Sequence, residues 1–147
     1  MAGDVFDFIV KLTRCGKAVR GFFDYNLRDQ NITLTQWELL MHLKESDIQE
    51  LRQMDLANLM NVDKGAVVKL VDRLERDGWV KRKTNSDDLR SNLVALTPKL
   101  NKDSGKVEKI LEASAKFLAG RINRSDIKKM SNDIEVILKA AKSGNQS

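Results

Sequence analysis

The sequence predicts a mainly α (α+β) fold, in which several helices are combined with one short β hairpin. Apolar residues recur at helical spacing along most of the 147-residue chain. One proline and 8 glycines leave long stretches free to form helices. Only residues 79–83 and 92–96 alternate in the manner of paired strands. We therefore expect a helical chain with an aliphatic core and a single hairpin.

The N-terminal part is predicted to be one long helix from Asp4 to Arg28. Apolar residues lie at roughly helical intervals along it, although Gly16 and Gly21 interrupt the pattern. A polar break at residues 29–31 is expected to end this helix.

A second helix is predicted to start at one of two threonines. Either Thr33 or Thr35 can cap it, and Glu38 stands where the capping-box partner of Thr35 belongs. Residues 46–50 then form a polar connection. We expect residues 48–52 to include a very short strand beside the hairpin.

Two short helices follow, separated by a break of three residues. The pattern of the first ends near Asn61, and Asp63 is a favourable N-cap for the second. Gly78 suits the left-handed position that often follows a helix. The predicted apolar faces consist of Met54, Leu56, Ala57 and Met60 in the first helix, and of Val67, Leu70, Val71 and Leu74 in the second.

The hairpin completes a unit with a known outline. Its strands, residues 79–83 and 92–96, flank a polar loop over residues 84–91. Helix, short break, helix and a hairpin with basic residues form a winged helix-turn-helix, which places its second helix in the major groove of DNA. From pattern alone, the alternative is a small helix pair with a solvated hairpin.

Beyond the hairpin, Pro98 marks the start of a second helical region. A helix is predicted from about Asp103 to Ile122, and Ser125 can cap a last helix after a polar break. In that last helix, apolar residues recur with 3, 4, 3, 4 spacing, which is a heptad-like seam. The seam consists of Ile127, Met130, Ile134, Ile137 and Ala141.

The terminal regions offer apolar faces that one compact winged unit cannot cover. We expect residues 1–32 and 98–147 to form a helical dimerisation region, and residues 33–97 to form the winged helix-turn-helix. Pairing the chain ends across a two-fold axis would bury these faces in a homodimer. The alternative is a monomer whose terminal helices pack on the winged unit itself.

Composition argues against several other classes of protein. The net charge of +5 is a mild basic bias, consistent with a polyanionic partner. With only one cysteine, Cys15, and one histidine, His42, we expect no disulfide, no metal and no nucleophile–histidine pair. There is no glycine-rich phosphate loop, so we expect neither an enzyme nor a cofactor. Without a secretory signal or an apolar run of roughly 20 residues, the expected compartment is the cytoplasm, with no membrane partner.

Several motifs are more specific than these patterns. Residues 32–37 (ITLTQW), 55–57 (DLA) and 67–82 (VVKLVDRLERDGWVKR), with Asp88-Leu89-Arg90 followed by Leu96-Thr97, resemble the MarR family of bacterial transcription regulators and its SlyA-like branch. The resemblance implies a homodimer that binds double-stranded DNA at a near-palindromic operator. It also implies modulation by a small aromatic or phenolic acid. The alternative function is a winged-helix adaptor that binds proteins without specific DNA binding.

The resemblance places the DNA-binding residues on the second helix of the pair and on the wing. Lys69 stands where the family usually carries a basic group that reaches DNA, whereas Arg73 is equally suited to pair with a carboxylate. Arg90 is implied as a minor-groove probe, with Asp88 orienting the wing. The full predicted set is Lys64, Gly65, Ala66, Val68, Lys69, Arg73, Lys83, Asp88 and Arg90.

Two features depart from the family pattern. Gly65 and Ala66 occupy positions where small polar residues are common, and neither side chain can donate a hydrogen bond to a base. Specificity is therefore expected to shift toward DNA shape. Leu89 stands where a second arginine is common in the SlyA-like branch. Residues 81–83 add three cations that are further candidates for phosphate contacts.

Candidate effector and redox residues are less specific. A cleft between the dimerisation region and the winged unit is the expected pocket, with Arg14, Arg20, Trp37 and His42 as candidate lining residues. The simpler interpretation is two solvated arginines, a surface histidine and a core tryptophan, and it is favoured. Cys15 could sense oxidants if basic neighbours lowered its pKa, but an inert cysteine is favoured.

Overall fold

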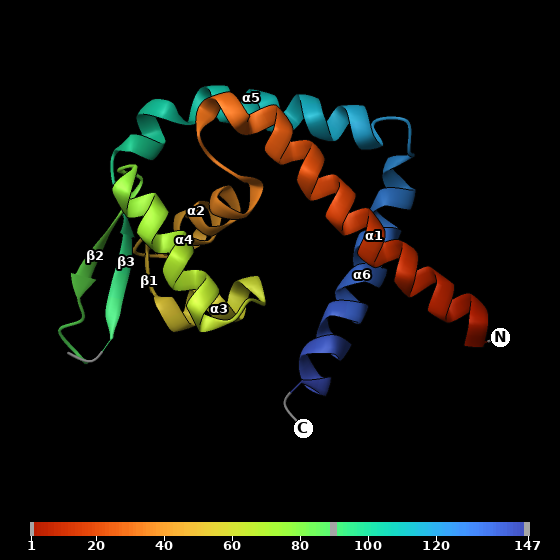
Figure 1. Ribbon diagram of the computed structural model, residues 1–147, viewed down its shortest axis with the longest axis horizontal. Coiled ribbons are helices and arrows are strands. Elements are labelled where there is room, and N and C mark those ends of the chain that lie inside the picture. The colour runs from red at the N-terminus through yellow and green to blue at the C-terminus, as the bar shows by residue number, and fades with distance from the viewer. Residues whose placement is uncertain (1, 89–90, 146–147) are drawn as a thin grey trace. The chain divides into compact units, whose positions relative to one another are not determined.

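The computed structural model describes residues 2–88 and 91–145, and its helices and strands follow the predicted order (Figure 1). The elements are α1 Ala2–Leu27, the 3-10 helix η1 Arg28–Gln30, α2 Leu34–Glu45, β1 Glu50–Arg52, α3 Gln53–Met60, α4 Lys64–Arg76, β2 Val80–Thr84, β3 Asn92–Leu96, α5 Lys99–Ala119 and α6 Arg124–Gly144. This mainly helical content with a small antiparallel sheet confirms the predicted fold class. The chain divides into two compact units, Met1–Leu111 and Glu112–Ser147.

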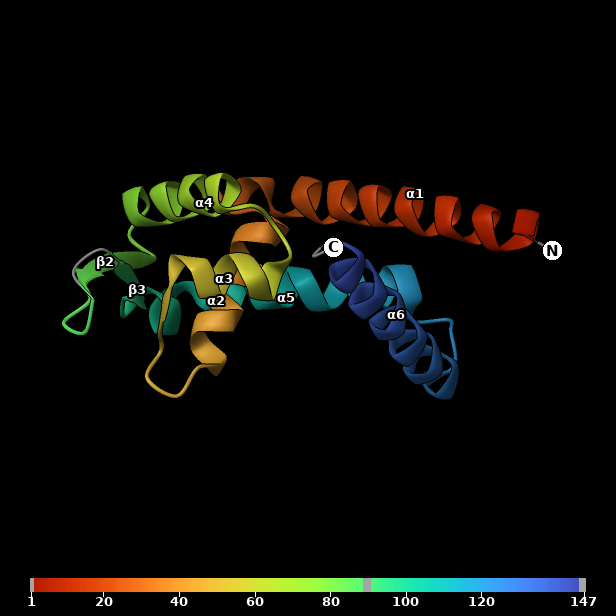
Figure 2. The ribbon, with the colours of Figure 1, turned by 90° about the horizontal axis from the view of Figure 1, so that it is seen from below.

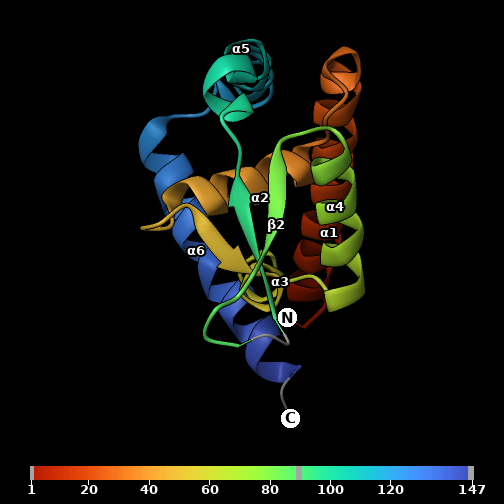
Figure 3. The same ribbon diagram turned by 90° about the vertical axis from the view of Figure 1, so that its left-hand side faces the viewer.

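The strands of the first unit form a three-stranded antiparallel sheet in the order β1-β3-β2 (Figure 3). Leu51 of β1 and Arg82 of β2 both pair with Val94 of the central strand β3. The predicted hairpin and the short strand beside it are thereby confirmed. However, β2 starts at Val80 rather than at residue 79. Trp79 is instead buried in the turn after α4, where its N–H donates to the Leu74 carbonyl at 2.9 Å.

The core of the first unit is formed by α2, the helix pair α3–α4 and the sheet, with further residues from α1 and α5. The helix α4 packs against α3 and β2, and α3 lies beside α2 (Figure 2). Each fully buried leucine or valine contributes about 1.5–3 kcal/mol relative to an exposed one. The core includes Leu27 of α1, Leu39, Leu40 and Leu43 of α2, Leu56 of α3, Val67, Val71 and Leu74 of α4, Val94 of β3, and Leu100 and Val107 of α5.

The predicted apolar face of α3 was wrong at one position. Met54 is 47% exposed, whereas Leu56, Ala57 and Met60 are buried. Because α3 begins at Gln53, Met54 lies in its first turn and about 200° around the helix from Leu56.

Caps fix where the helices of the first unit begin and end. Thr33, rather than Thr35, caps α2, because Thr33 has the extended backbone that a cap requires and Thr35 lies inside the helix. The Thr33 hydroxyl accepts from the Gln36 N–H at 3.2 Å, and the Gln36 amide oxygen accepts from the Thr33 N–H at 2.9 Å. The capping box therefore uses Gln36 and not Glu38. Gly78 has a φ of 85°, as predicted from its place after α4.

The helices near the C-terminus begin and end elsewhere than predicted. α5 starts at Lys99, immediately after Pro98, because proline is compatible with the first turn of a helix. It ends at Ala119, so the predicted range from Asp103 to Ile122 is shifted toward the C-terminus. α6 is capped by Asn123 instead of Ser125, since the Asn123 amide oxygen accepts from the Ser125 N–H at 2.9 Å.

Large apolar side chains are exposed at both ends of the chain. On α1 they are Val5, Phe6, Phe8 and Ile9, and in the second unit they are Phe117, Leu118, Ile122, Ile127, Met130, Ile134, Val136 and Leu138. Exposed apolar surface of this extent usually marks an interaction site. None of the described helices is both long enough and apolar enough to span a bilayer.

Candidate nucleic-acid interface

A left-handed turn and a side-chain cap position α4. Asn61 has a φ of 53° and ends α3, as the break in the sequence pattern predicts. The Asp63 carboxylate then accepts from the Ala66 N–H at 2.8 Å, which confirms Asp63 as the N-cap of α4. Because the apolar stripe of α4 is buried against α3 and the sheet, its charged stripe faces solvent.

Four cations of α4 are exposed, and one of them, Arg76, lies 3.1 Å from Asp77 Oδ1. The other three are Lys64, Lys69 and Arg73, and none forms an ion pair with another residue of the described ranges. The carboxylate partner that the sequence allowed for Arg73 is thus not found among those residues. The three charges remain available to an anion outside the chain.

The front of α4 presents backbone and small side chains. Gly65 is exposed, and a Cβ atom added there would lie 3.4 Å from Asp63 Oδ1, in ordinary van der Waals contact. Ala66 is half-buried, and its N–H is held by the cap. Val68 is also half-buried and does not expose its whole side chain.

The wing strands carry three cations in different environments. Lys81 is exposed, whereas the Lys83 ammonium lies 2.9 Å from Glu50 Oε2 on β1. Lys83 was predicted to contact DNA, and part of its charge is compensated by this carboxylate. Arg82 points back toward α4 and contacts two carboxylates there. The sequence predicted all three as candidates for phosphate contacts, but it did not show that Arg82 turns toward α4.

The wing loop is tied together beside the tip. Asn85 is buried and donates from its amide to Ser91 Oγ at 3.1 Å, and the Ser91 N–H donates to the Asp88 carbonyl at 3.1 Å. Leu89 and Arg90, the predicted minor-groove probe, lie outside the described residues.

A cationic corner that the sequence did not single out lies at the start of α3. Arg52 Nε and Nη2 contact the Asp55 carboxylate at 2.9 and 3.0 Å. The hydrogen bond from Arg52 lowers the pKa of Asp55, and the same bond, with a smaller attraction from Asp88, raises the pKa of Arg52. Arg52 also lines a cavity of about 200 Å³ with Gln53, Met54, Lys64, Ser91 and Asn92. The sequence did not indicate that Arg52 lies near Lys64, because their proximity depends on how α3 and α4 pack together.

The predicted effector residues do not share one site. Arg14 and Arg20 are exposed on α1, His42 is half-buried 3.9 Å from Glu38, and Trp37 is only 7% exposed in the core. A separate cavity of about 600 Å³ is lined by none of the four. Its lining consists of Asp29, Gln30, Asn31, Trp79, Lys99, Lys102, Asp103, Gly105, Lys106, Val107 and Lys109.

No cluster of three or more His, Cys, Asp or Glu residues that could hold a metal ion occurs in the described part of the chain. Cys15 is exposed on α1 as a free thiol.

Comparison with known proteins assigns the chain that carries this surface to a family. The sequence pattern of the MarR family matches residues 32–91, which include α2, both helices of the pair and most of the wing. The chain is also 32% identical over 99 residues to the multiple antibiotic resistance protein MarR of Salmonella typhimurium, with 65% of this chain and 67% of that protein covered. This chain belongs to the MarR family. Members of the MarR family are transcriptional regulators and not enzymes, which agrees with the prediction from composition.

Solved structures of MarR proteins share the fold over nearly the whole chain. Sco3205, a MarR family transcriptional regulator from Streptomyces coelicolor in complex with DNA, has a TM-score of 0.84 at 18% identity, covering 96% of this chain and 92% of that one. A mutant MarR from E. coli complexed with operator DNA has a TM-score of 0.76 at 22% identity, covering 90% and 97%. The winged helix predicted from the sequence is therefore the MarR fold.

Proposed function

We propose that this chain is a sequence-specific transcriptional regulator that binds double-stranded DNA as a homodimer in the cytoplasm. The observation that carries the proposal is the cationic face of α4, where Lys64, Lys69 and Arg73 are exposed without ion-pair partners in the described ranges. Such charges neutralise phosphates, which supplies much of the affinity of proteins for DNA. The MarR fold shared with two proteins whose structures contain DNA supports the same conclusion.

In this proposal, α4 enters the major groove and the wing reaches the adjacent minor groove. Lys64, Lys69 and Arg73 bind phosphates or base edges, while Gly65 and Ala66 let the backbone approach the bases closely. Val68 lies beside them as an apolar contact. Lys83, Asp88 and Arg90 act at the wing, with Asp88 orienting it and Arg90 probing the minor groove. The motifs that suggested the SlyA-like branch support this division of roles.

The homodimer is proposed to form through residues 1–32 and 98–147, leaving residues 33–97 to bind DNA. The exposed apolar side chains of α1, α5 and α6 support this division, because they would otherwise remain in water. A two-fold dimer presents two copies of α4 to one face of the duplex. Their separation of about one helical turn, roughly 34 Å, fits a near-palindromic operator.

An aromatic acid is proposed as the effector. Arg14, Arg20 and His42 are accessible to it, whereas Trp37 is buried in the core of the first unit. The cavity beside Trp79 supports an effector better, because four lysines and two aspartates line it and the excess of positive charge complements a carboxylate. A titration with 2-hydroxybenzoate followed by tryptophan fluorescence tests this. The Trp37→Phe variant should keep the response and the Trp79→Phe variant should lose it.

Salt dependence tests DNA binding against the protein-binding adaptor. For a duplex of random sequence, the logarithm of the association constant should fall linearly with the logarithm of salt concentration. Replacing Lys69 by Ala should make the slope shallower by about 1, because one phosphate contact is lost. The matched Lys128→Ala variant removes an exposed charge from α6 and should leave the slope unchanged. An adaptor would show no salt-dependent binding to duplex DNA.

A further inference from the structure

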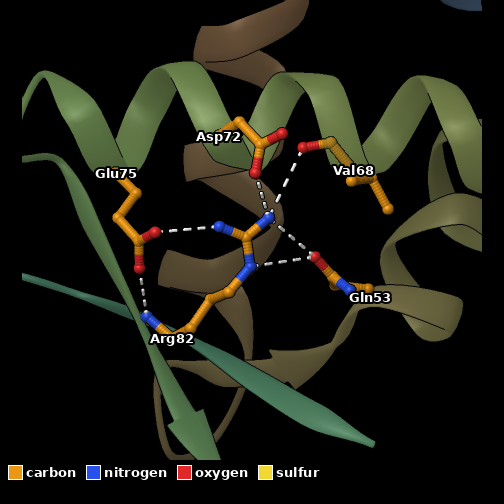
Figure 4. A network of polar contacts seen from close by, with 5 residues as sticks. All are labelled: Gln53, Val68, Asp72, Glu75 and Arg82. Carbon is orange, nitrogen blue, oxygen red and sulfur yellow. Dashed lines mark hydrogen bonds and ion pairs between the residues drawn. The ribbon is translucent and has the colours of Figure 1, made fainter.

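The side chain of Arg82 points into the winged unit and forms ion pairs with α4. It lies in the basic run 81–83 of β2, yet its side chain is only 21% exposed. Its Nη2 donates to Asp72 Oδ1 at 2.6 Å and its Nη1 to Glu75 Oε1 at 2.9 Å (Figure 4). Its backbone N–H also donates to Glu75 Oε2 at 3.0 Å. Both carboxylates of this stretch of α4 are thus bound to one residue of the wing.

The same guanidinium reaches the start of α3. Nε and Nη2 of Arg82 lie 3.3 and 3.2 Å from the amide oxygen of Gln53, and Nη2 lies 3.5 Å from the Val68 carbonyl (Figure 4). One side chain therefore joins α3, two turns of α4 and β2. Because the planar guanidinium has its donors in a fixed fork, it constrains these elements more tightly than a lysine would.

The contacts of Arg82 also determine which charged groups of the winged unit remain exposed to solvent. The donors of Arg82 are directed to acceptors within the chain, so few remain for a phosphate. If Arg82 were removed, the carboxylates of Asp72 and Glu75 would lose this cationic partner. Both carboxylates belong to α4, the helix proposed to enter the major groove. Lys81, the exposed neighbour on the same strand, forms no such contact with the part of the chain that the structure describes.

We propose that Arg82 is a positioning residue, which holds the recognition helix α4 and the wing in one relative orientation and so sets operator preference without touching DNA. The inference rests on the proposed function, since it assigns α4 and the wing to different grooves of one site. α4 and the wing can jointly distinguish one DNA sequence from another only if both contact the same site at the same time. Loss of the network should therefore weaken binding to the preferred site much more than binding to other DNA.

The test compares Arg82→Gln with the matched variant Lys81→Gln, which removes the same charge from the next residue. The probes are a duplex selected from a random pool by the wild-type chain and a scrambled duplex of equal composition. Arg82→Gln should lower the ratio of the two affinities at least about tenfold, with the salt slope unchanged. Lys81→Gln should keep the ratio. Arg82→Lys keeps the charge without the fork, and it should also lower the ratio.

A second variant keeps the test decisive if Arg82→Gln does not fold. Asp72→Asn removes a negative charge from α4, so a purely electrostatic view predicts tighter binding to both duplexes. Positioning by Arg82 predicts a lower affinity ratio instead. Equal weakening of both duplexes by Arg82→Gln, with a slope shallower by about 1, would identify Arg82 as a phosphate ligand and overturn the inference.

The inference and the proposed function fail in different ways. If the wild-type chain binds neither duplex, the proposed function is wrong and the inference is wrong with it. If the wild-type chain prefers the selected duplex and Arg82→Gln or Asp72→Asn retains that preference, only the inference is wrong.

Discussion

At the scale of single residues, the start of α4 depends on one carboxylate. Asp63 accepts the Ala66 N–H and leaves its own charge at the positive end of the helix, where an anion is favourable. The first turn of α4 carries Lys64, Gly65 and Ala66, all of which are proposed to face DNA. The cap therefore supports both the fold and the reading surface.

Replacing Asp63 by Ala should destabilise the chain by about 1 kcal/mol, because a helical N–H loses its partner. Asp63→Asn preserves an acceptor of the same shape and should cost much less. Urea denaturation followed by circular dichroism measures both free energies of unfolding. Equal destabilisation by the two variants would show that the cap is not the reason for the effect.

Asp55 provides a pH-dependent contribution to stability. Its pKa is lowered from 3.8 in the folded chain, first by the hydrogen bond from Arg52. A carboxyl with a lowered folded pKa adds stability above its unfolded pKa, and this contribution is lost as pH falls through the folded pKa. We expect the Asp55→Asn variant to show less acid destabilisation below about pH 4 than the wild-type chain. The contribution is small because the pair is accessible to solvent.

Carboxyl titration by NMR provides the direct check. The pKa of Asp55 should rise in the Arg52→Gln variant, because the hydrogen bond that lowers it is lost. An unchanged Asp55 pKa in that variant would remove Arg52 as the cause.

The residue scale also shows what local sequence can decide. Asp63 and Gly78 were correctly predicted because Asn61 closes the first helical pattern and because glycine adopts the left-handed backbone most easily. At Thr33 or Thr35, and at Asn123 or Ser125, two polar residues lie two positions apart, and either can accept a first-turn N–H. The backbone conformation of the preceding turn makes the choice, and that conformation depends on packing.

At the scale of elements, α4 and the wing act as a pair. Their outlines were predictable because the period changes from helical to alternating after Gly78, and β3 has the predicted bounds. The environment of the wing cations was not predictable, since it depends on which carboxylates α4 and β1 bring close. Arg82 and Lys83 are both paired in this way, whereas Lys81 has no ion pair within residues 2–88 and 91–145.

The wing tip gives a prediction at this scale. Arg90→Ala should weaken binding to the selected duplex markedly and flatten the preference for A·T-rich minor grooves, because a narrow groove attracts an inserted cation. A gel-shift series over duplexes of graded A·T content measures both effects. The matched Ser86→Ala variant alters the same loop without removing a charge, and it should bind as the wild-type chain does. Unchanged affinity and preference in Arg90→Ala would remove Arg90 from the site.

At the scale of the whole molecule, the proposed homodimer requires that a second chain cover the apolar seam of α6. Ile127, Met130 and Ile134 are each about 40% exposed, although they form a heptad-like stripe. The sequence predicted the stripe and favoured a homodimer, with a monomer whose terminal helices pack on the winged unit as the alternative. The shared MarR fold extends to this helix, since the similar structures cover 90% or more of the chain.

Charges placed in that seam should separate the dimer. The double variant Met130→Glu and Ile134→Glu would bury two carboxylates at the proposed interface, so it should have the mass of one chain, 16.7 kDa, by light scattering. Asn132→Glu places a charge away from the seam on the same helix and should leave the mass at that of two chains. An unaltered mass in the double variant would show that α6 does not form the interface.

Selection of bound duplexes from a random-sequence pool tests the central claim most directly, because it reports DNA binding and half-site geometry together. The account predicts enrichment of an inverted repeat, with half-site centres about 10 base pairs apart and two chains bound to each duplex. Failure to enrich any sequence, even at low salt, or binding of a single chain to an asymmetric site, would contradict it.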